Sequence, residues 1–530
     1  MWLPIVALAL AATALVSLQT FFAGRLASGD RMLFTFIILV ATFAIVAAWF
    51  FFAAGVSRKT RGIGVLVLGG AILCAVLGVR RVEFSGDMVP TIDFRWQHDR
   101  AAALEAHRAR QQAEIAAAKN ADALPPIDVQ VSDDDVLEYW GPHRDGIIAG
   151  PKLARDWSAQ PPRMVWRQPV GGGYASFVVV GRTVVTIEQR RDKEAVVAYD
   201  ANTGVERWVY DYPALFSEVL GGDGPRATPT FHQGKLYALG ATGVLSCLDF
   251  ATGKHIWSCD ILKDNHCGNL DWAMSGSPLV YDELVLVNPG NQKGTDESRA
   301  IAAYAQSDGK PMWGCGRAKA GYASPTIVTL AGVRQVLIFD AGGLAGHDAA
   351  DGSELWRVPW KSDWDINASQ PVVLSNDRLL ITSASGAALV QIAHADGAWK
   401  VTDVWRGRDM KCGYSSPIAY QGHLYGLDEN MLACVDLATG KRLWKDRGGQ
   451  FGHGQMLLRD DLLLVLSEAG ELALVEATPK RFNELGRIQA IDGKTWNVPA
   501  LVGRRIFVRN HLEMAAYDLP TESQPPVSNP

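Results

Sequence analysis

A short motif returns, with changes, along most of the sequence. In its clearest copy Asp200, Gly204 and Trp208 stand four residues apart, after an apolar run and before another. Asp accepts hydrogen bonds from the backbone that follows it and Gly adopts positive φ without steric cost, so the motif predicts a tight turn. The apolar flanks predict strands. Because one strand-turn-strand unit cannot bury its own face, a chain of such units must stack them. Further copies end at Trp257, Trp356 and Trp444.

The remaining units are found by spacing. Tryptophans recur every forty or fifty residues, and between them a small or polar residue precedes Pro and a new strand. Each unit then has four antiparallel strands, A to D, which is the pattern of a propeller blade. The last unit ends after strand C at Asp518, whereas the first has a spare strand at 164–168. We therefore predict an all-β, eight-bladed β-propeller of four-stranded antiparallel blades over residues 136–520, closed by this N-terminal strand. The tryptophans expected to dock one blade on the next are Trp208, Trp257, Trp313, Trp356, Trp405 and Trp444.

Three uncharged apolar runs open the chain, at residues 1–24, 32–57 and 62–79. A helix needs about 20 apolar residues to cross a bilayer, so residues 1–81 are predicted to form three transmembrane α-helices. A cleaved signal peptide is the alternative for the first run, but no basic segment precedes it and two more runs follow. Residues 82–135 are predicted to be a linker with a solvated helical stalk at 98–120, and residues 521–530 a disordered tail.

Basic residues between the apolar runs suggest an orientation. Arg58, Lys59 and Arg61 lie between the second and third runs, a small excess over the other flanks. This bias predicts that the loop and the N-terminus lie on the cytoplasmic side of the membrane, and that everything after Val79 lies on the other side. In a bacterium the chain would be integral to the inner (cytoplasmic) membrane, with the propeller on the periplasmic or other extracytoplasmic side.

Composition excludes some functions. The formal net charge is -5, so nothing indicates a nucleic-acid partner. The seven cysteines include no Cys-x-x-Cys pair and no covalent haem motif. A local disulfide between Cys259 and Cys267 would be compatible with an oxidising compartment.

The Asp-x-x-Thr-Gly-x-x-x-Trp repeat resembles the pyrroloquinoline quinone (PQQ) repeat propellers, over about residues 139–520. That superfamily contains quinoprotein alcohol dehydrogenases and non-enzymatic, BamB-like assembly factors. Segments 86–96, 140–146, 221–229 and 493–497 are similar to a membrane-anchored bacterial group with PQQ-binding-like repeats. The resemblance implies the fold strongly and an activity only weakly.

Strand polarity predicts where a ligand would bind. The D-to-A and B-to-C loops should share one face, and the A-to-B and Thr-Gly turns the other. Eight D-to-A loops would converge on the axis as a funnel with aromatic walls and a few polar groups. The alternative is that aromatic and small residues merely line the crowded axis. The funnel candidates are Tyr174, Asp223, Arg226, Asp271, Trp272, Tyr322, Trp364, Asn367, Tyr414, His453, Trp496 and Asn497.

A flat anionic ligand or a peptide would suit such a funnel, with Arg226 meeting a carboxylate and Trp272, Trp364 or Trp496 stacking on a ring. PQQ would also require calcium, which takes oxygen ligands. Oxygens are available on Glu188, Asp223, Asp271, Asp365 and Asn367, but they do not match the dehydrogenase ligand pattern. No metal site and no catalytic residue is predicted.

The sequence therefore favours a membrane-tethered binding or scaffolding platform with a protein partner on a propeller face. The alternative is a PQQ- and calcium-dependent membrane dehydrogenase of alcohols or sugars. A third interpretation, a small-molecule sensor, lacks a signalling domain among the segments expected inside.

Overall fold

The computed structural model describes residues 2–22, 28–53, 55–86, 88–97, 99–117, 125–290, 295 and 298–522. Contacts divide the chain into two compact units. The first is Met1–Asp99 with Glu218–Gly222, and the second is Arg100–Ser217 with Asp223–Pro530. Most of the predicted tail, and Asp87 of one resemblance segment, lie outside the described residues.

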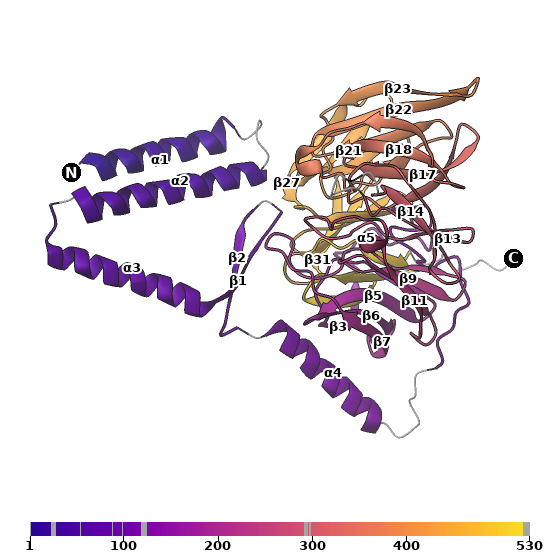
Figure 1. Ribbon diagram of the computed structural model, residues 1–530, viewed down its shortest axis with the longest axis horizontal. Helices are drawn as coiled ribbons and strands as arrows, with labels where there is room; N and C mark the ends of the chain where they lie inside the picture. The colour runs from indigo at the N-terminus through magenta and orange to yellow at the C-terminus, as the bar shows by residue number, and fades with distance from the viewer. Residues whose placement is uncertain are drawn as a thin grey trace. The chain divides into compact units, whose positions relative to one another are not determined.

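The first unit contains the three predicted helices. They are α1 (Trp2–Thr20), α2 (Ser28–Ala48), which continues into a π-helical turn (Trp49–Ala53), and α3 (Arg58–Gly78). All three are long and apolar enough to cross a membrane by length and composition. Helices α1 and α2 lie side by side, with Gln19 Nε2 3.4 Å from Thr35 Oγ1 (Figure 1). Ser57 caps α3 by accepting the Thr60 N–H at 3.1 Å.

A two-stranded hairpin lies within the segment predicted to be a linker. Strands β1 (Val79–Phe84) and β2 (Pro90–Phe94) pair antiparallel. Arg80 Nη2 donates to the carbonyls of Arg95 and Gln97 at 3.0 and 2.9 Å, which ties the hairpin to the chain that follows it. The linker prediction missed this pairing because the two strands are short and carry charged residues.

Helix α4 (Arg100–Ala117) lies where the helical stalk was predicted, but the expectation that its charged face only solvates it was wrong. It belongs to the second unit and packs on the propeller. Arg108 forms a bidentate pair with Glu206 at 2.9 and 3.0 Å, and Gln111 donates to Gln168 at 3.3 Å. Leu104, one of its few apolar residues, is buried. The charged face therefore binds a blade instead of only solvating the helix.

The second unit contains eight four-stranded antiparallel sheets, which confirms the predicted propeller (Figure 1). Seven blades each consist of four consecutive strands and are numbered 1 to 7 in chain order. Blade 1 is β4 (Val178–Val180), β5 (Thr183–Arg190), β6 (Lys193–Asp200) and β7 (Glu206–Pro213); blade 2 is β8 (Thr230–His232), β9 (Lys235–Leu239), β10 (Val244–Asp249) and β11 (His255–Asp260); blade 3 is β12 (Leu279–Tyr281), β13 (Leu284–Val287), β14 (Ile301–Ala305) and β15 (Pro311–Cys315); blade 4 is β16 (Thr326–Leu330), β17 (Val333–Asp340), β18 (Gly343–Asp348) and β19 (Glu354–Pro359). Blade 5 is β20 (Val372–Val373), β21 (Arg378–Ser383), β22 (Gly386–Ala395) and β23 (Ala398–Gly407); blade 6 is β24 (Ile418–Tyr420), β25 (His423–Asp428), β26 (Met431–Asp436) and β27 (Arg442–Gln450); blade 7 is β28 (Gln455–Arg459), β29 (Leu462–Leu466), β30 (Glu471–Glu476) and β31 (Glu484–Gln489). Two short helical turns, α5 (Ile261–Asp264) and η2 (Asp363–Asp365), lie in D-to-A loops.

The eighth blade joins the two ends of the propeller sequence. Its strands, in spatial order, are β3 (Arg163–Pro169), β34 (Glu513–Asp518), β33 (Arg505–Arg509) and β32 (Ala500–Val502). The predicted closure by the N-terminal strand is confirmed, since β3 pairs antiparallel with β34 from Arg163↔Asp518 to Pro169↔Glu513. Strand β34 consequently has a neighbour on both sides, and the ring has no open blade.

The repeated motif joins each blade to the next. Asp200 Oδ1 accepts the N–H groups of Asn202 and Thr203 at 3.1 Å, and Gly204 takes φ of 72°. The tryptophan of one blade covers the motif glycine of the following blade: a Cβ at Gly253 would lie 2.5 Å from Trp208 Cε3. The indole N–H also crosses to the next blade in five cases. Trp166, Trp208, Trp257, Trp405 and Trp444 donate to the carbonyls of Ala201, Phe250, Gln306, Leu437 and Thr478 at 3.0, 3.0, 3.0, 2.8 and 2.9 Å.

Blade 5 departs from the motif, and the structure gives the reason. Its outer strands β22 and β23 form a longer hairpin that turns at Asp396 and Gly397, both at positive φ (52° and 74°). Such a two-residue turn is typical of tight hairpins. The preceding Trp356 has no Thr-Gly turn to cover and donates to Gln335 Oε1 of its own blade at 2.6 Å. Trp313 packs on Gly352 of the next blade.

We expect Trp257→Ala to lower the free energy of unfolding by about 3–5 kcal/mol, because Trp257 is buried and its removal leaves a cavity between blades 2 and 3. The same change at Trp364, which is 83% exposed, should leave stability nearly unchanged. Thermal melts of the two variants in detergent test this. An unaltered melting temperature for Trp257→Ala would show that the tryptophan is not a blade anchor.

The stability of the pairing between β3 and β34, which closes the ring, should depend on pH. Burial raises the pKa of Asp518, but hydrogen bonds from Arg505 and Arg163 outweigh it, so the pKa lies below its ordinary value. Arg163 Nη2 and Arg505 Nε donate to this carboxylate at 2.7 and 2.8 Å. A lowered pKa means that the stability from these pairs is present above the unfolded-state pKa, about 3.9, and is lost as pH falls below it.

We therefore expect Asp518→Asn to lower the melting temperature at pH 7 and to differ less from the native protein near pH 3. Asp211→Asn is the control, because the Asp211 side chain is 44% exposed in its pair with Lys193. A difference for Asp518→Asn that persists unchanged at acidic pH would contradict the seam's dependence on this carboxylate.

Candidate functional site

A belt of hydrogen bonds surrounds the propeller axis where the A strands begin. Each bond runs from a backbone N–H of one blade to a side-chain oxygen at the equivalent position of the next blade. The five bonds are Ser176 to Thr228 (3.0 Å), Thr228 to Ser277 (2.9 Å), Ser277 to Ser324 (2.9 Å), Ser324 to Gln370 (2.6 Å) and Gln370 to Ser416 (2.9 Å). Ser176 Oγ donates to Val498 O at 2.6 Å, which links the belt to blade 8. The small or polar residue before each proline therefore joins blades, a role that the sequence did not suggest.

The chain's own entry segment occupies the channel inside this belt. Val136 pairs with Val179 of blade 1, Leu137 O accepts the Phe231 N–H of blade 2 at 2.7 Å, and Trp140 Nε1 donates to Met456 O of blade 7 at 3.0 Å. One segment thus contacts blades on different sides of the axis.

Arg144 lies at the centre of this segment and is 3% exposed. Its guanidinium donates to the carbonyls of Ser277, Pro278 and Pro325 at 3.3, 2.7 and 2.6 Å, and Nε pairs with Glu138 at 2.7 Å. Three backbone carbonyls and one carboxylate therefore satisfy a buried cation. The channel is filled at this level, so a ligand on the axis would rest on the face formed by the D-to-A loops.

An aromatic group, the axial cluster, lies on that face. Tyr174 is 5.3 Å from Trp496 between ring centroids, and Tyr414 lies nearly parallel to Trp496 at 6.3 Å and 13°. His453 meets the Tyr414 ring edge to face at 4.8 Å. These rings come from blades 1, 6, 7 and 8, so the fold brings together residues that the sequence predicted separately.

Two cations lie over these rings. Lys494 Nζ is 4.4 Å from the Trp496 centroid, and the Arg226 guanidinium carbon is 5.8 Å from the Tyr174 centroid. The Glu468 carboxylate holds two of these residues in place. Trp496 Nε1 donates to its Oε1 at 3.0 Å, and the backbone N–H of His453 donates to its Oε2 at 3.1 Å. We define the axial cluster as these seven residues: Tyr174, Arg226, Tyr414, His453, Glu468, Lys494 and Trp496.

Such an arrangement is suited to binding. It offers aromatic faces, positive charge and fixed hydrogen-bond geometry, which suit stacking and recognition of carboxylates.

The other predicted funnel residues lie apart from the cluster or serve the loops. Trp272 and Tyr322 form a second pair at 5.9 Å, while Asp271 and Trp364 are exposed. Asn367 Nδ2 donates to Asp340 O at 2.7 Å and Asn497 Nδ2 to Ala175 O at 2.8 Å, and both side chains are buried. These asparagines brace loops through their Nδ2 groups, and their predicted part in a ligand funnel stays a prediction. Asp223 lies beside Gly172.

The donor oxygens considered for PQQ-bound calcium do not fit a metal site. Glu188 is buried in a pair with Arg190 at 2.5 Å and accepts the Tyr199 hydroxyl at 3.1 Å. Asp365 pairs with Lys319 at 3.6 Å. In the described part of the chain, no group of three or more His, Cys, Asp or Glu side chains could hold a metal ion.

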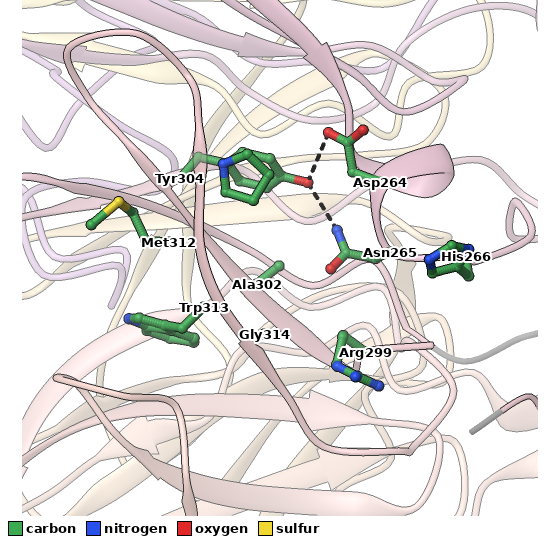
Figure 2. A pocket seen from close by; sticks show the side chains of 10 residues that line it. Asp264, Asn265, His266, Arg299, Ala302, Tyr304, Met312, Trp313 and Gly314 are labelled. Carbon is green, nitrogen blue, oxygen red and sulfur yellow. Dashed lines mark hydrogen bonds between the residues drawn. The ribbon is translucent and has the colours of Figure 1, made fainter. Parts of the chain in front are cut away.

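A polar recess on blade 3 is a separate feature (Figure 2). Its volume is about 430 Å³. Tyr304 accepts from Asn265 Nδ2 at 2.8 Å and donates to Asp264 Oδ2 at 3.5 Å. Burial, together with Cys259 and Asp264, raises the pKa of Tyr304, so its hydroxyl stays protonated. The recess offers hydrogen bonds but no activated nucleophile. The residues around it are Asp264, Asn265, His266, Arg299, Ala302, Tyr304, Pro311, Met312, Trp313 and Gly314.

The suggested disulfide between Cys259 and Cys267 is not formed in the structure. Cys267 is buried with its Sγ against the Gly290 carbonyl. Burial raises the pKa of Cys259 to about 12, so this thiol is unreactive at neutral pH.

Sequence reasoning missed Glu468, Lys494 and Arg144 as site residues. Glu468 follows strand β29 in a B-to-C loop, and strand polarity had already placed these loops on the same face as the D-to-A loops. A search of both loop sets would have included it. Arg144 lies in a non-repeating segment, and no spacing in the sequence relates it to the axis.

Comparison with known proteins agrees with this architecture. Residues 217–446 match the family model described as outer membrane protein assembly factor BamB. The chain is a PQQ-repeat β-propeller protein. This PQQ-repeat propeller is 22% identical over 263 residues to BamB of Moranella endobia (strain PCIT), covering 47% of this chain and 64% of that protein, so the match spans just under two thirds of the relative.

Two further comparisons give one more sequence relative and one structural neighbour of the PQQ-repeat propeller. It is 24% identical over 304 residues to BamB of Burkholderia pseudomallei (strain K96243), covering 54% of this chain and 69% of that protein. Its fold is similar to the quinohemoprotein alcohol dehydrogenase from Comamonas testosteroni, with a TM-score of 0.54, 13% identity and coverage of 81% and 86% of the two chains. At that identity the likeness shows the fold alone.

Arg144→Met should destabilise the propeller by about 3 kcal/mol, because it leaves three buried carbonyls without their donor. Arg155→Met, which removes a partly exposed ion pair with Asp461 and Glu476, should cost about 1 kcal/mol or less. Melting temperatures and protease resistance of both variants provide the measurement. Equal effects would contradict a structural role for the axial arginine.

Proposed function

We propose that this protein is a membrane-tethered, extracytoplasmic binding platform that holds a protein partner on the face of the D-to-A loops. Three apolar helices support the tether, and the basic residues between the second and third support an outward propeller. In a bacterium the tether would lie in the inner membrane. The similarity to BamB proteins supports a scaffolding role over an enzymatic one.

The observation that carries the proposal is the axial cluster above a filled channel. A dehydrogenase needs a recess deep enough to enclose a cofactor, whereas here Arg144 and the belt fill the axis. What remains on the face is a set of aromatic and basic side chains, including Tyr414, which is 46% exposed. Tyr, Trp and Arg dominate the binding energy of protein interfaces, so this composition suits a partner surface.

A cofactor titration separates the platform from a PQQ-dependent dehydrogenase. PQQ and Ca²⁺ are added to the full chain in detergent, followed by alcohols or sugars and a redox dye. We expect no bound-quinone absorbance band and no dye reduction, because the oxygen donors do not converge. Substrate-dependent dye reduction would overturn the platform.

Photo-crosslinking tests the partner face directly. A photoreactive residue at position 414 in native membranes should give a discrete adduct with one extracytoplasmic protein. The same residue at Lys254, which is exposed on a Thr-Gly turn of the opposite face, is the control. Adducts at position 254 but not at 414 would contradict the assigned face.

A further inference from the structure

A second recess lies between blades 4 and 5, on the face of the D-to-A loops, with a volume of about 320 Å³. Trp360 and Lys361 follow strand β19, Ser385 lies in the turn between β21 and β22, and Arg406 and Arg408 lie at the end of β23. None of these residues belongs to the axial cluster. Three cationic side chains therefore meet around one small hollow.

One wall of the recess is rigid. Trp360 is buried, its Nε1 donates to Ser383 Oγ at 2.9 Å, and its backbone N–H donates to Gly342 O at 3.1 Å. The Arg406 guanidinium carbon lies 4.8 Å from the Trp360 ring centroid. Asp403 holds the same guanidinium from the other side, with contacts at 3.1 and 3.4 Å. An aromatic face and a carboxylate thus preorganise one cation at the recess.

The other two cations are available. Lys361 and Arg408 are exposed, and in the described part of the chain neither forms a hydrogen bond or an ion pair. Two described carboxylates close to these residues in the sequence pair with other cations, Asp365 with Lys319 at 3.6 Å and Asp409 with Arg442 at 3.7 Å. Asp403 therefore balances only one of the three charges. The recess is positive and its free donors point to an anionic ligand.

An exposed tryptophan extends this surface. Trp364 lies three residues after Lys361, so their Cα atoms are at most about 11 Å apart. It is 83% exposed and its φ is 60°, in a turn where the Asp365 N–H donates to Ser362 O at 3.3 Å. A bulky residue rarely adopts positive φ, and such strain collects at functional sites. Trp364 lies in the same D-to-A loop as Lys361 and would supply the apolar contact that a purely ionic site lacks.

We infer that this surface, the blade 4–5 recess with Trp364, binds an acidic segment of a partner protein. Carboxylates of the segment would meet Lys361, Arg406 and Arg408, and an apolar side chain of the segment would pack on Trp364. A walled recess with one apolar neighbour suits a side chain of a peptide better than a flat lipid surface. The inference rests on the proposed platform role, but it uses none of the axial cluster.

The test uses the full chain in zwitterionic nanodiscs and a fluorescein-labelled peptide of glutamates and leucines, with a matched peptide in which glutamine replaces each glutamate. We expect the acidic peptide to bind and the glutamine peptide not to bind, with affinity falling as salt rises. Lys361→Glu with Arg408→Glu should weaken binding at least about tenfold. Trp364→Ala should weaken it about fivefold.

A matched control separates this surface from general charge. Lys254→Glu with Lys441→Glu makes the same change in net charge on exposed turns and should leave binding unchanged. Equal binding of both peptides, or undiminished binding by the recess variant, would overturn the inference. So would binding of the recess to phosphatidylglycerol vesicles in place of the peptide. A failure here would leave the crosslink at position 414 intact, whereas failure of the platform would remove that crosslink.

Discussion

The structure depends on how each blade is held by the next. A tryptophan of one blade covers the glycine of the next blade's turn, and its indole N–H often reaches a carbonyl there, as Trp257 does with Gln306. On the axis, Ser277 and Ser324 belong to a belt in which backbone donors bind side chains of the following blade. Both interactions cross a blade boundary, so neither can form in an isolated repeat. The ring as a whole is therefore the unit of stability.

Closure extends the same interactions to the two ends of the ring. Strand β3 completes blade 8, and the buried guanidinium of Arg509 donates to the carbonyls of Gly171 and Ile187 in blade 1 at 3.0 and 3.1 Å. Burial lowers the pKa of Arg509, but these carbonyls compensate its charge with hydrogen bonds. The entry segment then fills the axis through Arg144. A closed ring with a filled axis leaves its loop faces for recognition, where the axial cluster and the blade 4–5 recess both lie.

The repeated fold could be predicted because its chemistry repeats. Asp200, Gly204 and Trp208 define a turn whose sterics leave little choice, and a missing final strand requires a donor from elsewhere in the chain. The packing of helix α4, the β1–β2 hairpin and the path of the entry segment could not be predicted in this way, because their partners do not follow the repeat. Arg108, for example, looks like any solvated charge until Glu206 is placed beside it.

In the candidate site, too, some features could be predicted from the repeat and others could not. Tyr174, Tyr414 and Trp496 were found from their equivalent loop positions, and they do gather. Asn367 and Asn497 lie in D-to-A loops as well, but their amide nitrogens turn inward to donate to backbone carbonyls. Loop position selects a face of the propeller, whereas local hydrogen-bond demand decides which side chains point into it. Sequence spacing contains the first kind of information and not the second.

Hydrogen exchange of strand β34 tests the closed ring most directly. In a closed ring β34 is an inner strand between β3 and β33, so its amides should exchange as slowly as those of the equivalent strands β10 and β26. If the ring is open at this seam, β34 is an edge strand. Its amides would then exchange as fast as those of the outer strand β23, and that result would contradict the account.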